Sequence, residues 1–112
     1  MFGTGSVMCW GDNSLNQLGD GTTTTRSTPV AVSSVSTAIA VAAGSGHSCV
    51  VLSTGGVMCW GSNTAGQLGD GTTTTRSVPG SVSGLTGLTV TAVGTGWYHS
   101  CALLSNSSVI CW

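Results

Sequence analysis

Five cysteines are the residues of this chain best able to form covalent bonds, and four of them fall into two equally spaced pairs. Cys49 and Cys59 are ten residues apart, as are Cys101 and Cys111, and a turn-forming segment separates the members of each pair. Facing residues on adjacent antiparallel strands come within disulfide range. A three-residue loop with a bulge would place the paired cysteines opposite each other. We therefore predict disulfides Cys49–Cys59 and Cys101–Cys111, with Cys9 free.

Two other uses of these cysteines stay open on the sequence alone. They could be reduced thiols that pack as small apolar side chains. A zinc site could use His47, Cys49 and Cys59, but a structural zinc ion needs four ligands and neither repeat holds a further His or Cys nearby. We predict no metal and no cofactor. Disulfides would place the protein in an oxidising compartment, outside the cell or in the cell envelope.

No nucleophile, base and acid can be assembled into a catalytic set. His47 and His99 recur at equivalent repeat positions, which is typical of residues that link one structural unit to the next by hydrogen bonds. There is no Glu, and Asp20 and Asp70 lie in identical Gly-Asp-Gly turns, where Asp serves turn geometry. We therefore predict that the chain is not an enzyme.

The two arginines have a structural interpretation. Arg26 and Arg76 each follow an identical run of threonines, six residues after Asp20 and Asp70 respectively. We expect them to pair with these aspartates, and such pairs could bridge neighbouring units of the repeat.

The charge of the chain limits its partners. The 112 residues carry two arginines, three aspartates and no lysine, for a formal net charge of −1. Nucleic acids and anionic membranes are bound through clustered positive charge. We expect neither as a partner. The N-terminal residues lack the basic and apolar segments of a signal peptide, so an export signal would lie outside these residues.

A repeat of about fifty residues organises the whole chain. Val-Met-Cys-Trp-Gly occurs at 7–11 and 57–61, with a shortened copy at 109–112, and the segment 17–27 recurs unchanged at 67–77. Each unit of such a repeat buries its apolar face only against a neighbour. We divide the chain into the end of a first repeat (1–43), a complete unit (44–93) and the start of a third (94–112).

Short apolar runs and Gly-rich turns predict that each unit is made of strands. Hairpins are expected near 47–61 and 99–112, and no helix longer than one turn, because no segment has helical periodicity. Four short antiparallel strands per fifty residues is typical of a propeller blade. The predicted fold class is all-β: about two blades of a partial β-propeller.

The tryptophans fall into two groups. Trp10, Trp60 and Trp112 are periodic, so we expect them to pack within blades with their indole N–H groups hydrogen-bonded. Trp97 and Tyr98 replace Ser45 and Gly46 of the preceding repeat, so the scaffold does not require aromatic residues there. They are predicted to contact either the next blade or a separate protein.

These motifs carry a family resemblance. Gly-x-x-His-Ser-Cys, a hairpin, Val-x-Cys-Trp-Gly-x-Asn and Gly-Gln-Leu-Gly-Asp-Gly-Thr are similar to the regulator-of-chromosome-condensation repeat, in its cysteine-containing bacterial variety. The resemblance implies blades of a seven-bladed ring, of which this chain would be a fragment. The alternative is a short protomer that completes a ring by self-association.

The sequence predicts one function and leaves two alternatives open. We expect a non-catalytic scaffold for protein–protein interaction, part of a longer exported bacterial propeller. The resemblance raises nucleotide exchange on a small GTPase as an alternative, but this chain lacks the acidic and basic loop residues that such activity needs. Carbohydrate binding is a third, resting on Trp97 and Tyr98 alone.

Overall fold

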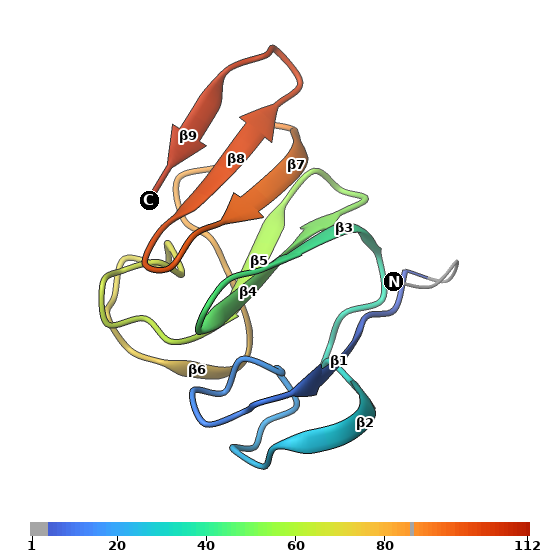
Figure 1. The fold of residues 1–112 in the computed structure, drawn as a ribbon. Helices are drawn as coiled ribbons and strands as arrows, with labels where there is room; N and C mark the ends of the chain where they lie inside the picture. The colour runs from blue at the N-terminus through green and yellow to red at the C-terminus, as the bar shows by residue number, and fades with distance from the viewer. Residues whose placement is uncertain (1–4, 86) are drawn as a thin grey trace.

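The computed structural model describes residues 5–85 and 87–112, and these form nine β-strands with no α-helix. The strands are grouped in three antiparallel sheets that lie side by side, with the four-stranded sheet in the middle (Figure 1). The predicted all-β class and the partial propeller are confirmed. The strands, in sheet order, are β1 (Met8–Gly11) and β2 (Arg26–Ala31); β3 (Ala38–Ala43), β4 (His47–Leu52), β5 (Val57–Gly61) and β6 (Arg76–Ser81); β7 (Val90–Thr95), β8 (Ser100–Leu104) and β9 (Val109–Cys111).

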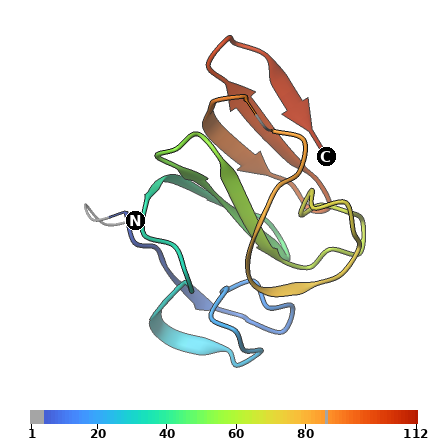
Figure 2. The same cartoon turned by 180° about the vertical axis from the view of Figure 1, so that it is seen from behind.

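The middle sheet, β3–β6, is a complete blade of four strands in chain order. Its first strand begins at Ala38, ahead of the unit 44–93 defined on the sequence, so the sequence repeat and the blade are out of phase by one strand. The β1–β2 sheet holds the strands equivalent to β5 and β6, and the β7–β9 sheet holds those equivalent to β3, β4 and β5. Figure 2 shows the same three layers from behind.

The hairpins have the predicted loop. Ser53, Thr54 and Gly55 connect β4 to β5, and the Gly56 carbonyl accepts a hydrogen bond from the Leu52 N–H at 2.9 Å. Gly55 has a φ of 89°, a left-handed conformation that suits glycine in a three-residue loop. The loop sets the register so that Cys49 lies directly opposite Cys59.

Burial follows from the number of neighbouring sheets. Successive residues of β4 point to opposite faces, and both faces are covered: Val50 packs in the core shared with the β1–β2 sheet, and Val51 in the core shared with the β7–β9 sheet. In β8 only one face is covered: Ala102 on that face is buried, whereas Leu103 on the other face is 42% exposed. Strands β4 and β5 of the central blade are therefore the best-buried strands of the described chain.

Candidate functional site

The aromatic pair lies on the turn between β7 and β8. Trp97 is 72% exposed and Tyr98 is 62% exposed. The equivalent turn of the middle blade lies beside it, since the Ser45 hydroxyl donates a 3.4 Å hydrogen bond to the Trp97 carbonyl. Two large aromatic side chains are thus presented to solvent from a short turn held between two strands, on the edge formed by neighbouring blade turns.

In the middle blade, the position equivalent to Tyr98 lies against the loop of the preceding repeat. A Cβ atom on Gly46, the equivalent residue, would come within 2.9 Å of the Leu15 side chain from the preceding loop. At the next junction the residue equivalent to Leu15 is Ala65. The larger side chain is thus on the loop at one junction and on the turn at the next.

His47 forms the blade-to-blade link that its repetition indicates. Its Nε2 lies 2.9 Å from the Ser100 hydroxyl of the next sheet, and that hydroxyl donates to the Gln67 carbonyl at 2.8 Å. Burial lowers the pKa of His47, so the imidazole is neutral at physiological pH. His99, the equivalent residue just before β8, is exposed. The imidazole is bonded across the junction through Nε2, and its buried Nδ1 has no hydrogen-bond partner among the described residues.

The cysteines form both expected disulfides. Cys49 is bonded to Cys59 and Cys101 to Cys111, with Cα–Cα distances of 4.1 and 4.0 Å. Cys9 is a free, half-buried thiol whose pKa is raised by burial. Because Cys49 and Cys59 are bonded to each other, they cannot serve as the zinc thiolates considered above, and the described residues hold no cluster of three metal-binding side chains.

The aspartate–arginine pairs stay within one loop. Arg26 Nε contacts Asp20 Oδ2 at 3.2 Å, and Arg76 Nε contacts Asp70 Oδ2 at 2.6 Å. Each pair joins the two ends of a loop in a single repeat, so the pairs do not bridge neighbouring blades. The two residues of a pair lie six positions apart, and their contact closes the loop between them.

The electrostatics of these aspartates are those of structural carboxylates. The Arg76 guanidinium holds the pKa of Asp70 well below its usual range, with further hydrogen bonds from Thr72 and Asn63. Burial raises the pKa of Asp20, but hydrogen bonds led by those from Thr22 outweigh it and leave that pKa lowered. Both carboxylates are ionised and fully engaged, so neither is available as a general acid or base.

Only one of the three periodic tryptophans packs as expected with a bonded indole. Trp60 is fully buried, and its indole N–H donates to the Gln17 carbonyl of the preceding repeat at 2.9 Å. Trp112 is partly buried, and its N–H has no partner among the described residues. Trp10 is 61% exposed, which corrects our expectation for it. The reason is that Trp60 packs on the loop of the repeat before it, and no described residues form such a loop beside Trp10.

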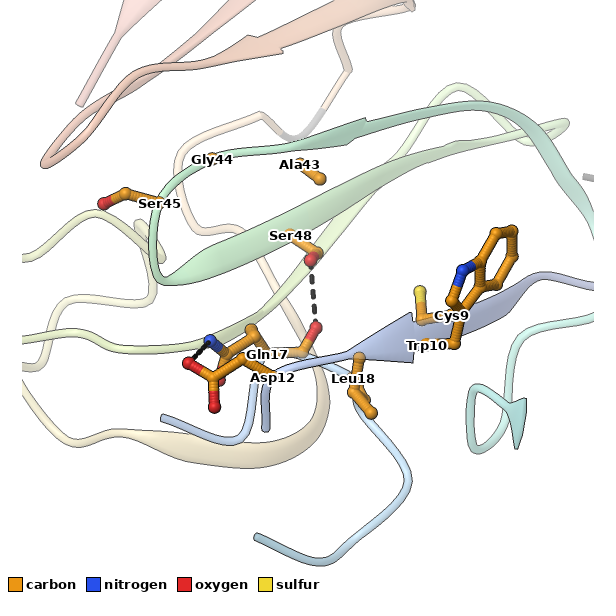
Figure 3. Close-up of a pocket in the computed structure, with 9 residues that line it drawn as sticks. All are labelled: Cys9, Trp10, Asp12, Gln17, Leu18, Ala43, Gly44, Ser45 and Ser48. Carbon is orange, nitrogen blue, oxygen red and sulfur yellow. Dashed lines mark hydrogen bonds between the residues drawn. The ribbon is translucent and has the colours of Figure 1, made fainter. Parts of the chain in front are cut away.

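A groove of about 350 Å³ lies between β1 and the β3–β4 hairpin, and sequence reasoning did not predict it (Figure 3). We call it the open groove. Figure 3 shows the Cys9 thiol on one side and the Ser48 hydroxyl, which donates to the Gln17 carbonyl at 3.0 Å, on the other. Its lining residues are Cys9, Trp10, Asp12, Gln17, Leu18, Ala43, Gly44, Ser45 and Ser48. The sequence did hold one signal for this groove: the repeat makes Ser48 equivalent to Ser100, which lies at the next junction between sheets.

No helix of the described chain has the length and apolar character needed to cross a membrane. Comparison with curated protein sequences finds no match.

Solved structures that share this architecture include the following three. Human WBSCR16 superposes with a TM-score of 0.88 at 25% identity, over 100% of this chain and 29% of its own. Prp20p from Saccharomyces cerevisiae, described with its binding properties to Gsp1p and histones, gives 0.80 at 25% identity, over 96% and 28%. Yeast RCC1 (Prp20) bound to Kap60 gives 0.78 at 20% identity, over 96% and 25%. The chain thus spans less than a third of each of these proteins.

The family model of the regulator of chromosome condensation (RCC1) repeat matches residues 4–51 and 54–103, and a second model of the same repeat matches residues 38–67. Together the two matches of the first model cover most of the chain. Each match spans four strands, β1–β4 and β5–β8, so the boundary between the two matches falls in the turn between β4 and β5 of the middle blade. The chain therefore belongs to the RCC1 repeat family.

Proposed function

We propose that this chain is part of a non-catalytic propeller scaffold that binds another protein through Trp97 and Tyr98. The observation that carries the proposal is the exposure of both rings on a turn whose equivalent in the middle blade is Ser45-Gly46. Large aromatic side chains are enriched among the residues that dominate protein interfaces. A rigid sheet that supports a short turn is also the usual way in which such folds present binding residues.

The engagement of the polar side chains supports a binding role over a catalytic one. His47, Asp20 and Asp70 are each held by hydrogen bonds or ion pairs that keep the blade together. Solved relatives of the same architecture are described as binding proteins: Prp20p with Gsp1p and histones, and yeast RCC1 with Kap60. Partner binding is therefore proposed for this chain, with the partner's identity left to experiment.

We further propose that the parent protein is longer and exported. The solved relatives are more than three times the length of this chain, which supports further repeats. The two disulfides support an oxidising compartment, since cytosolic thiols are kept reduced.

The test of the binding site is an exchange of residues between repeats. Trp97→Ser with Tyr98→Gly copies the preceding turn and should abolish partner capture by immobilised protein while leaving the melting temperature unchanged. Val109→Ser removes an equally exposed apolar side chain elsewhere and should leave capture intact. Unchanged capture by the double variant would contradict the proposal.

The same variants separate the alternative functions. Binding of the wild-type protein to a glycan array, lost in the double variant, would assign the pair to carbohydrate instead. Stimulated nucleotide release from a small GTPase would assign the chain to exchange. Loss of stability in the double variant, with capture unchanged per folded molecule, would assign the aromatic pair to packing.

A further inference from the structure

The turn between β8 and β9 carries a motif that the binding site at Trp97 does not use. Asn106-Ser107-Ser108 follows the pattern Asn-x-Ser without proline, which is the acceptor motif for N-linked sugars in exported proteins. The other three asparagines lack a serine or threonine two positions later: Asn13, Asn16 and Asn63. Asn106 is therefore the one asparagine of this chain whose sequence context allows the modification.

The modification also requires an accessible side-chain nitrogen, and the four asparagines differ in this respect. Asn13 and Asn63 are fully buried, and each Nδ2 donates hydrogen bonds to backbone carbonyls of the threonine run in its own repeat. The Asn16 Nδ2 donates to the Thr22 carbonyl at 3.0 Å. Asn106 is exposed, and its Nδ2 has no hydrogen-bond partner among the described residues. The required sequence context and an available nitrogen thus coincide at Asn106.

The turn holds the two residues that define the motif in a fixed arrangement. The Asn106 Oδ1 accepts a hydrogen bond from the Ser108 N–H at 2.9 Å, which closes an Asx turn. The Leu104 N–H donates to the Ser108 carbonyl at 2.8 Å and closes the hairpin loop. Ser108 is exposed, and its hydroxyl has no hydrogen-bond partner in the described part of the chain. Both polar groups that define the motif, the amide nitrogen and the hydroxyl, are therefore available to a transferase.

The equivalent turn of the middle blade shows that the fold needs neither residue. Thr54 occupies the position of Asn106, and Gly56 occupies that of Ser108. The two turns are anchored alike, because in each the first loop residue donates its N–H to a carbonyl of the segment that precedes the sheet. The acceptor asparagine and its serine are thus additions to a turn that forms without them.

The turn lies away from the aromatic pair. Figure 1 shows the β7–β8 turn and the β8–β9 turn at opposite ends of β8. This strand has five residues, so the two turns are separated by roughly 17 Å. A sugar attached to Asn106 would therefore leave Trp97 and Tyr98 uncovered.

We propose that Asn106 is an N-glycosylation site, at which Nδ2 accepts a sugar from a diphosphate-activated donor. The nitrogen forms a bond to the anomeric carbon of the sugar while the bond between that carbon and the diphosphate oxygen breaks. The diphosphate leaves with the bonding electron pair, and one proton leaves Nδ2. The inference rests on the proposed export, because N-linked sugars are carried on surface loops of exported proteins.

The first experiment isolates the protein from the envelope and extracellular fractions of its source. Mass spectrometry of the proteolytic peptide that contains Asn106 should find a sugar on that side chain. A preassembled oligosaccharide would identify a lipid-linked donor and a single sugar a nucleotide-linked donor, and either result supports the site.

The outcomes that overturn the site can be told apart from a failure of the export proposal. An unmodified Asn106 in protein from these fractions would overturn the site and leave export intact. Protein confined to the cytoplasm and lacking the sugar would overturn both. Sugars found only on the threonine runs would also overturn the site.

The second experiment compares single variants produced in the same source. Ser108→Ala removes the hydroxyl of the motif but keeps Asn106, and it should abolish the sugar. Ser107→Gly is the matched control: it keeps the motif and should retain the sugar, since Ser107 has a φ of 71°, which glycine adopts readily. Asn106→Thr copies Thr54 of the middle blade, so it should lose the sugar and still fold, as judged by circular dichroism. A sugar retained in Ser108→Ala, or lost in Ser107→Gly, would overturn the proposal.

Discussion

Two junctions between neighbouring sheets differ in one strand. Around β4 the cysteine, histidine and glycine contacts are all made, and the central strands are buried on both faces. The open groove is lined by Cys9, Ser48 and Gly44, which are equivalent to the contact residues Cys59, Ser100 and Gly96. There, however, Cys9 is free and Trp10 is 61% exposed. Residues of identical motifs therefore contribute differently to stability, because their burial depends on the neighbouring sheet and not on their own blade.

The largest expected difference in stability is between Trp60→Ala and Trp10→Ala, the same substitution at two equivalent tryptophans. Trp60→Ala leaves a large cavity at a fully buried site and should lower the free energy of unfolding by about 3–5 kcal/mol. Trp10→Ala removes a side chain that lies mostly in solvent and should change it by less than about 0.5 kcal/mol. Urea denaturation of both variants measures the difference, and equal losses would show that Trp10 is covered in solution.

A smaller effect is expected at the glycine on which Trp60 packs. Gly19 has a φ of 69°, and a Cβ atom there would lie 2.6 Å from the Trp60 indole nitrogen. Gly19→Ala should cost roughly 2–4 kcal/mol, from the left-handed backbone and from overpacking.

Gly66 is the matched control, because it has a φ of 76° and no other atom would lie within 4 Å of a Cβ added to it. Gly66→Ala should therefore cost only the backbone part, about 1–2 kcal/mol. Thermal denaturation of the two variants separates backbone strain from contact with the next blade. If both variants lost the same stability, the packing of Trp60 on Gly19 would be contradicted.

The cysteines give the next comparison. Replacing Cys49 and Cys59 together by serine opens a short loop and should cost roughly 2–3 kcal/mol by chain entropy. Cys9→Ser breaks no bond and should cost less than about 1 kcal/mol. Titration with a thiol reagent should find one reactive group in the oxidised wild-type protein. Three such groups before any reductant is added would contradict the disulfide assignment.

The smallest expected effect is the acid sensitivity of the loops. The folded-state pKa values of Asp20 and Asp70 are lowered, so their contribution to stability is present above the ordinary aspartate pKa of about 3.9 and is lost as the pH falls through the lower, folded-state values. Asp70→Asn should reduce this loss by about 1 kcal/mol. Urea denaturation from neutral to acidic pH tests this, and an unchanged pH slope would contradict the role of Asp70.

Much of the fold was accessible from the sequence because the repeat encodes it directly. The ten-residue cysteine spacing and the glycine at position 55 predict the hairpin register, and the structure has the same loop. The period of the apolar strands predicts blades. The start of the blade was less accessible, since nothing in the repeat marks Ala38 as the beginning of a sheet.

The open groove and the exposure of Trp10 could not be predicted from the sequence, for a physical reason. Both depend on which surfaces of a blade are covered, and covering is a property of the assembled sheets. Repetition alone predicted that Trp10 would behave like Trp60. Only the arrangement in space shows that Ser48 and Cys9 face the same groove from two different sheets.

The most direct test of the open groove is amide hydrogen exchange at Met8, compared with Met58. Met58 lies in a strand paired on both sides, and its amide should exchange slowly. The Met8 N–H points away from β2, the strand with which β1 pairs in the described chain, and should exchange about tenfold faster or more. A Met8 amide as protected as that of Met58 would contradict the account.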